Sequence, residues 1–141
     1  METANRIKIT VETTVNAPVD KVWAYWTLPE HITKWAAASD DWHTTSATND
    51  VRVGGTFSSR MEAKDGSFGF DFGGIYDDIM IYEFIGYTLG DGRKVVIEFT
   101  GKGQETRIVQ TFEAESTNPI EMQRGGWQAI INNFKKYTEA N

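Results

Sequence analysis

The stretch between residues 41 and 114 alternates β-type segments with turns, and this pattern restricts the fold more than any other feature. Six segments are rich in aromatic and β-branched residues: DWHTTSA, GGTFSSRMEA, FGFDFGGIYDDIMIY, FIGYTLG, RKVVIEFTG and ETRIVQTFEA. The turns that separate them include NDV, KDG, GDG and GKGQ. Strands joined by such turns form antiparallel hairpins. The sequence therefore predicts an antiparallel meander, and Gly73 with Gly74 predicts a bulge or bend in its longest strand.

The residues before this meander predict one more strand and two short helices. Segment 6–15 alternates, with Ile7, Ile9, Val11, Thr13 and Val15 on one face. In NAPVDKVWAYW, Pro18 suits the first helical position, where no backbone N–H is needed. LPEHITKW again begins with a proline and predicts a second short helix that ends near Trp35.

The C-terminal segment predicts a long amphipathic helix. Asn118 suits the N-cap, Pro119 the first helical position, and Glu121 a contact back to the cap. Three- and four-residue steps then place an apolar stripe on one face, formed by Ile120, Trp127, Ile130, Ile131, Phe134 and Tyr137. One helix against a curved sheet of six to seven strands gives a two-layer α+β fold. Because a curved sheet cannot touch one helix across its whole breadth, we expect large side chains or a ligand between them.

Gly125 and Gly126 stand beside the first large apolar residue of this helix, Trp127. Each glycine in a helix interior costs roughly 1 kcal/mol relative to alanine. Two explanations are open at this point. The pair either lets the helix pack closely against the sheet, or it leaves an opening over an internal cavity.

Six successive motifs carry a resemblance to a known family: APVDKVWAYWTLPEHITKW, GGTFSSRMEA, GGIYDDI, YTLGDGRKVVIEF, TFEAE and GWQAIINNFKKYTE. In order and spacing they resemble the SRPBCC (START/Bet v 1-like) superfamily, specifically proteins similar to the C-terminal domain of the activator of Hsp90 ATPase. The resemblance implies one domain over residues 1–141 with a helix-grip fold and a hydrophobic cavity. It departs at Met80, Ile81 and Tyr82, because relatives commonly have a proline there, so we expect a different turn.

Composition excludes several classes of function. The formal net charge of −6 leaves no basic stripe for nucleic acid. The chain has no cysteine, which excludes disulfides and thiolate chemistry. No stretch approaches the roughly 18 apolar residues of a membrane span, and no signal segment is recognisable. We therefore expect a cytoplasmic protein, monomeric or weakly dimeric, without nucleic acid as a partner.

The predicted function is binding of a hydrophobic or amphipathic small molecule, lipid-like or similar to an aromatic polyketide, between the sheet and the last helix. Aromatic walls would supply contact area, and Tyr76, Ser59 or Arg60 would orient the ligand. Small-molecule pockets typically measure roughly 300 Å³ or more. The predicted ligand-binding residues are Trp23, Trp26, Trp35, Phe57, Ser59, Met61, Phe70, Tyr76, Trp127, Ile130, Ile131 and Phe134.

Two alternatives stay open. An enzyme of the cyclase or hydratase kind, which superfamily relatives can be, needs a buried acid or base, for which Glu98 is the candidate. A chaperone-associated interaction module follows only from analogy with the Hsp90 activator.

Motifs for catalysis or metal binding are weak. His31, Asp40, Asp41 and His43 match no metal-ligand spacing. Asp77 and Asp78 fall on opposite faces of a strand, so they do not form a carboxylate dyad. The sequence lacks a nucleophile elbow, and TGKGQ joins two strands instead of opening a helix. We therefore expect no catalytic residue, no metal and no cofactor.

Overall fold

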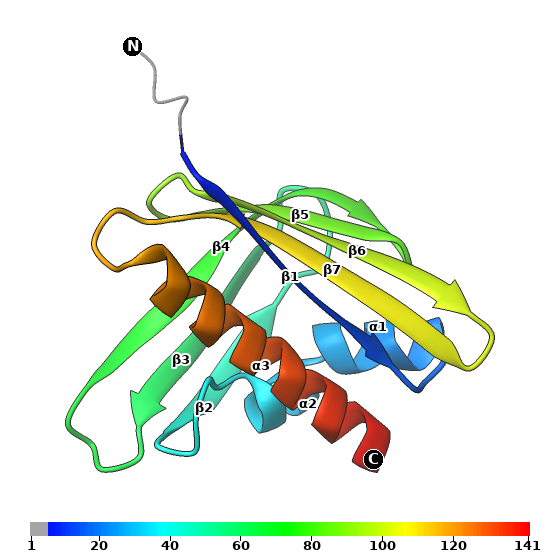
Figure 1. Ribbon diagram of the computed structural model, residues 1–141, viewed down its shortest axis with the longest axis horizontal. Coiled ribbons are helices and arrows are strands. Elements are labelled where there is room, and N and C mark those ends of the chain that lie inside the picture. The colour runs from blue at the N-terminus through cyan, green and yellow to red at the C-terminus, as the bar shows by residue number, and fades with distance from the viewer. Residues whose placement is uncertain (1–5) are drawn as a thin grey trace.

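The computed structural model describes residues 6–141, so residues 1–5 of the predicted domain lie outside the described part. Seven antiparallel strands form one curled sheet in the order β1-β7-β6-β5-β4-β3-β2 (Figure 1). The strands are β1 (Lys8–Val15), β2 (Trp42–Asn49), β3 (Thr56–Ala63), β4 (Gly69–Met80), β5 (Phe84–Leu89), β6 (Lys94–Lys102) and β7 (Glu105–Glu113). The helices are α1 (Val19–Thr27), α2 (Pro29–Trp35) and α3 (Ile120–Ala140). The predicted α+β helix-grip architecture is confirmed.

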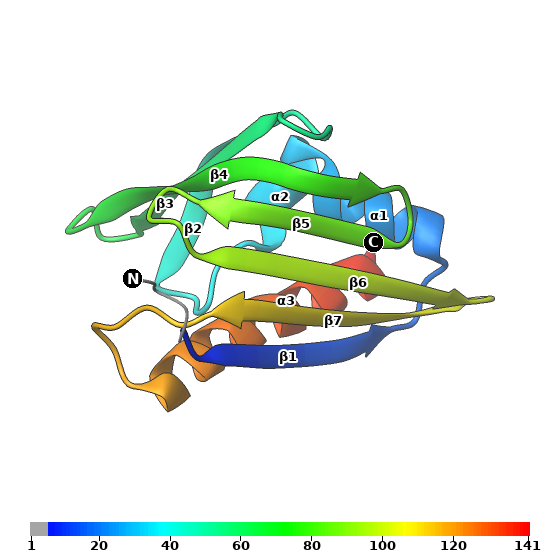
Figure 2. The same ribbon diagram turned by 90° about the horizontal axis from the view of Figure 1, so that it is seen from above.

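The sheet curls around one face, and all three helices lie on that face (Figure 2). The inward positions follow the alternation of the sequence, as Ile9, Val11 and Val15 of β1 are buried. Ile7 is an exception to the prediction: it precedes β1 and is 57% exposed. The α3 helix packs mainly against β1, and its Trp127 ring stacks on Phe112 of β7 at a centroid distance of 3.9 Å.

The predicted helix starts are one residue early at two places. Pro18 and Pro119 are N-cap residues with extended backbone, whereas α2 begins at Pro29 as predicted. Asn118 does not cap α3, because its side chain donates to the Glu115 carboxylate. The Gln123 amide closes this turn instead, donating to the Glu115 and Asn118 carbonyl oxygens at 3.0 and 2.8 Å. Glu121 pairs with Arg124 and does not reach the cap.

The bulge of β4 does not lie at Gly73 and Gly74. Both glycines pair regularly with β3, and the register with β5 shifts between Tyr76 and Asp78. Glycine is required at these two positions for a steric reason. A Cβ on Gly73 or Gly74 would lie 2.3 Å from a backbone carbonyl oxygen of a neighbouring strand, closer than any side chain permits.

The turn after β4 contains the departure from the family pattern. Tyr82 adopts a positive φ of 71°. Proline is fixed near −65°, so it is excluded at this position. The Tyr82 ring meets Trp23 edge-on at 6.1 Å, which fastens the turn to α1.

Close packing does not explain Gly125 and Gly126. A Cβ built on either residue would meet nothing within 4 Å outside its own helix. Open space beside the helix is compatible with the second explanation, an opening over the cavity. Ile130, one turn further along α3, lines that cavity.

Substituting Gly126→Ala is therefore expected to stabilise the protein by about 0.5–1 kcal/mol, because alanine restricts the unfolded backbone and meets no obstacle. Urea unfolding monitored by circular dichroism measures the change. Gly74→Ala is the contrasting variant and is expected to destabilise the sheet. A loss of stability in Gly126→Ala would show that the space beside α3 is occupied in solution.

Candidate functional site

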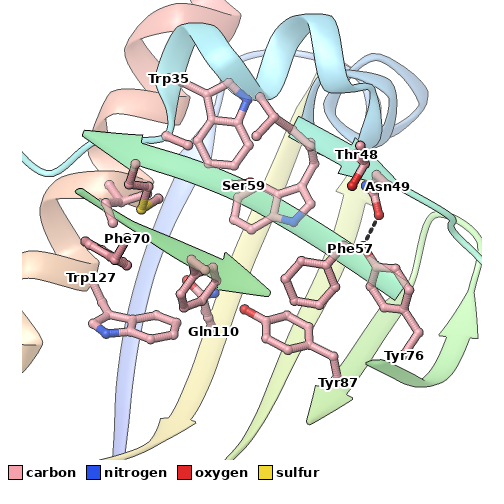
Figure 3. Close-up of a pocket in the computed structure, with 16 residues that line it drawn as sticks. Trp35, Thr48, Asn49, Phe57, Ser59, Phe70, Tyr76, Tyr87, Gln110 and Trp127 are labelled. Carbon is pink, nitrogen blue, oxygen red and sulfur yellow. Dashed lines mark hydrogen bonds between the residues drawn. The ribbon is translucent and has the colours of Figure 1, made fainter. Parts of the chain in front are cut away.

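A partly open cavity of about 240 Å³ lies between the curled sheet, α2 and the middle of α3 (Figure 3). Its walls are mostly apolar and aromatic, and they come from β2 to β5, β7 and the three helices. The lining residues are Trp26, Ile32, Trp35, Ala36, Thr48, Asn49, Phe57, Ser59, Met61, Phe70, Phe72, Tyr76, Tyr87, Gln110, Trp127 and Ile130.

The cavity volume is smaller than the expected 300 Å³. An apolar cavity of about 150 Å³ is nevertheless enough to bind benzene. At 240 Å³ the space therefore fits a ligand of one or two rings or a short aliphatic chain. A large polycyclic polyketide does not fit without movement of the walls.

Most of the residues predicted from the sequence meet at this cavity. The structure brings together Trp26, Trp35, Phe57, Ser59, Met61, Phe70, Tyr76, Trp127 and Ile130. Three others lie in the core outside the cavity wall. Ile131 and Phe134 are completely buried, and Trp23 packs edge-on against Phe99. The sequence-based prediction assigned these three residues to the cavity wall, because helical spacing marks the buried face of a helix but does not distinguish core from cavity.

Arg60 does not orient a ligand in this structure. It follows Ser59 on β3, and successive strand residues point to opposite faces. Its guanidinium pairs with Glu62 at 3.0 Å and with Asp71 at 3.5 Å, and it is absent from the cavity wall.

Several lining residues were missed from the sequence: Ile32, Ala36, Thr48, Asn49, Phe72, Tyr87 and Gln110. One of these residues, Gln110, could have been recognised from the sequence. Inward positions of β7 hold Thr106, Ile108, Gln110 and Phe112, and all four are buried. A long amide between two large apolar residues on the inner face of a strand indicates a polar contact inside the fold.

Asn49 and Tyr76 form a polar anchor at one end of the cavity. The Tyr76 hydroxyl donates to the Asn49 side-chain oxygen, and the Asn49 amide donates to the Thr27 carbonyl at 2.7 Å. These bonds join β2, β4 and the end of α1. Burial raises the pKa of Tyr76 to about 12, although the bond to Asn49 acts in the opposite direction.

This shift predicts loss of stability at high pH. The pKa of tyrosine in an unfolded chain is about 10. The folded state holds the Tyr76 proton more tightly, so the stabilisation is complete below pH 10 and is lost as the pH rises toward about 12. The free energy of unfolding, measured by urea titration at several pH values, is expected to fall over this range. Tyr76→Phe is expected to lessen that fall, and an unchanged slope would contradict the assignment.

The cavity wall contains no Asp, Glu, His, Lys or Arg among residues 6–141. Glu98, the candidate acid or base, is exposed on β6 because alternation turns it away from the core between Ile97 and Phe99. Asp77 and Asp78 are exposed as well, and Asp77 accepts a hydrogen bond from Thr88 at 2.6 Å. The cavity thus offers apolar contacts and neutral hydrogen-bonding groups.

Asp40 and His43 line a second, more open and polar groove beside α2, together with Lys34, Lys64 and Lys136. His31 lies apart from them: its Nδ1 is 2.7 Å from the Tyr137 hydroxyl, and its ring stacks on Tyr25. Within the described part of the chain, no three His, Cys, Asp or Glu residues are placed to hold a metal ion. Among residues 6–141, no helix is long and apolar enough to cross a membrane.

The curled sheet, the long helix across it and the apolar cavity between them define a helix-grip α+β domain, in general a ligand-binding class of fold. The family model described as "Activator of Hsp90 ATPase homolog 1-like protein" matches residues 16–139. The chain therefore belongs to this family, which confirms the resemblance recognised in the sequence.

Solved structures agree with this assignment. The AHSA1-like protein from Aeromonas hydrophila is 40% identical with a TM-score of 0.89, over 95% of this chain and 93% of that one. Protein Chr148 from Cytophaga hutchinsonii is 57% identical with a TM-score of 0.81 and the same coverage. NE0264 from Nitrosomonas europaea, 19% identical with a TM-score of 0.81 over 95% of each chain, shares the fold. Comparison with the curated proteins gave no match.

Proposed function

We propose that this protein binds a small hydrophobic or amphipathic molecule in the cavity under α3. The observation that carries the proposal is the partly open, mainly apolar space of about 240 Å³ between the sheet and the helices. Protein interiors are close-packed, so space on this scale sacrifices contacts that side chains would otherwise make. A ligand that fills the space regains those contacts and removes its own apolar surface from water.

The five tryptophans provide the test. Trp26, Trp35 and Trp127 line the cavity, whereas Trp23 and Trp42 do not. In a nitrogen-15 NMR titration with one- and two-ring compounds and medium-chain alcohols, we expect the indole signals of the three lining tryptophans to shift together, with those of Phe57 and Phe70. Saturation at one-to-one stoichiometry would support a single site. Shifts confined to Trp23, Trp42 or outer residues would refute the proposal.

The two alternatives, a cyclase or hydratase-type enzyme and a chaperone-associated module, have less support, because the structural observations concern a cavity with a neutral lining. Within the described range 6–141, Tyr76 and Tyr87 are the only titratable groups that line the site and could serve an enzyme. A chaperone partner follows from the family description alone.

A further inference from the structure

Two polar side chains are buried at the inner surface of the sheet where the cavity meets it. Tyr87 of β5 is 7% exposed and Gln110 of β7 is 6% exposed. They reach toward each other across β6, and the Tyr87 hydroxyl faces the Gln110 side chain (Figure 3). Both line the cavity. Burial raises the pKa of Tyr87, so this hydroxyl keeps its proton and remains available as a donor.

The hydrogen-bonding capacity of this pair exceeds what the protein uses. A glutamine amide has two donor hydrogens and an acceptor oxygen, and a tyrosine hydroxyl donates one bond and accepts others. Among residues 6–141, neither side chain has a hydrogen bond to a residue outside this pair, and the polar atoms of both are not sealed from the cavity. Polar groups that face a cavity and have spare hydrogen-bonding capacity indicate a position for a polar atom of a guest.

The other buried polar pair on the wall differs in this respect. The Asn49 side chain uses its oxygen for Tyr76 and its amide for Thr27. It holds the fold together and has little capacity left for a ligand. The polar pair at Asn49 and Tyr76 is therefore occupied, whereas the pair at Tyr87 and Gln110 is free for a ligand.

The residues that line the cavity also indicate the charge of its ligand. No charged side chain of residues 6–141 lines the cavity, so a buried carboxylate or ammonium group would lose its hydration without gaining a counter-charge. A neutral hydroxyl or carbonyl group avoids this cost and still bonds to Tyr87 and Gln110. The volume of about 240 Å³ leaves room for one or two rings beside the aromatic walls.

We infer that the cavity selects an uncharged ligand of one or two rings whose hydroxyl or carbonyl group hydrogen-bonds with Tyr87 and Gln110. This inference rests on the proposed binding function and names the chemical class of its ligand. It also makes Tyr87 and Gln110 specificity-determining residues, while the aromatic wall supplies most of the affinity.

Three probes with the same ring system separate the contributions of apolar contact, hydrogen bonding and charge to affinity. Naphthalene has no polar group, naphthol has a neutral hydroxyl, and naphthoate is anionic at pH 7. Affinities are measured by the indole shifts of Trp26, Trp35 and Trp127. We expect naphthol to bind about three- to tenfold more tightly than naphthalene, the factor of one neutral hydrogen bond, and naphthoate to bind most weakly. In Tyr87→Phe and Gln110→Leu, the advantage of naphthol is expected to disappear, while naphthalene binds as before.

Tyr82→Phe is the matched control, because it removes the same kind of hydroxyl from a tyrosine that does not line the cavity. It is expected to keep the preference for naphthol. Circular dichroism verifies that each variant is folded, and Tyr87→Phe and Gln110→Leu test the same pair independently. If naphthoate equals naphthol, or if both variants keep the preference, the inference is wrong while cavity binding stands. If no probe shifts the three tryptophans, the proposed function fails and the inference with it.

Discussion

Replacing Phe134 by alanine is expected to destabilise the protein by about 3–5 kcal/mol, the usual cost of removing a buried aromatic ring. Phe134 lies on the inner face of α3 and has no exposed surface. Its ring meets Trp26 and Trp35 edge-on, at centroid distances of 4.8 and 4.9 Å. Loss of the ring removes both contacts and leaves an empty volume in the core. Urea unfolding followed by circular dichroism measures the effect.

The same substitution is expected to disturb the cavity, although Phe134 does not line it. Trp26 and Trp35 form part of the wall and are held from behind by this ring. In Phe134→Ala, their indole signals are expected to broaden or shift in the absence of any ligand. Phe134→Leu, which keeps more of the buried volume, is the control and should lose clearly less stability. A loss below about 1 kcal/mol in Phe134→Ala would contradict the packing described for α3.

Replacing Ser59 by phenylalanine is expected to abolish ligand binding without unfolding the protein. Ser59 lies between Phe57 and Met61 on β3, is buried, and lines the cavity. A ring at this position takes the space that a guest would occupy, so we expect affinity for any cavity ligand to fall at least about tenfold. Filling an existing apolar space costs little and often stabilises a protein by about 0.5–2 kcal/mol.

Ser58→Phe is the matched control for this variant. Ser58 is the preceding residue of the same strand and does not line the cavity. The Ser58→Phe variant is expected to bind naphthol with unchanged affinity in the same NMR titration. Undiminished binding to a folded Ser59→Phe variant would place the ligand outside the cavity.

Local patterns predicted much of this molecule. The strands begin and end close to the expected residues, because alternation and turn residues act over neighbouring positions. The same alternation placed Phe57, Ser59 and Met61 together on the cavity side of β3. The helical stripe correctly identified Ile131 and Phe134 as buried but placed them at the cavity, because spacing gives the face of a helix and not what lies opposite that face.

The features that the sequence did not reveal depend on which competing side-chain and backbone groups meet in the folded chain. Gln123 rather than Asn118 closes the turn before α3, because the Glu115 carboxylate competes for Asn118. The β4 bulge lies between Tyr76 and Asp78 rather than at the two glycines, whose role is set by the backbone of adjacent strands. The outward position of Arg60 is different, because alternation with Ser59 on β3 already placed it on the outer face beside Glu62 and Asp71.

The sequence by itself determined the curved antiparallel sheet, the long terminal helix and the aromatic character of the space between them, because each follows from periodicity and residue type. Only the tertiary structure decided that this space measures about 240 Å³ and that Tyr87 and Gln110 face each other inside it. The distance between sheet and helix is the outcome of sheet curvature and of packing such as Trp127 on Phe112. A small change in that distance separates a filled core from a cavity, and no local pattern encodes it.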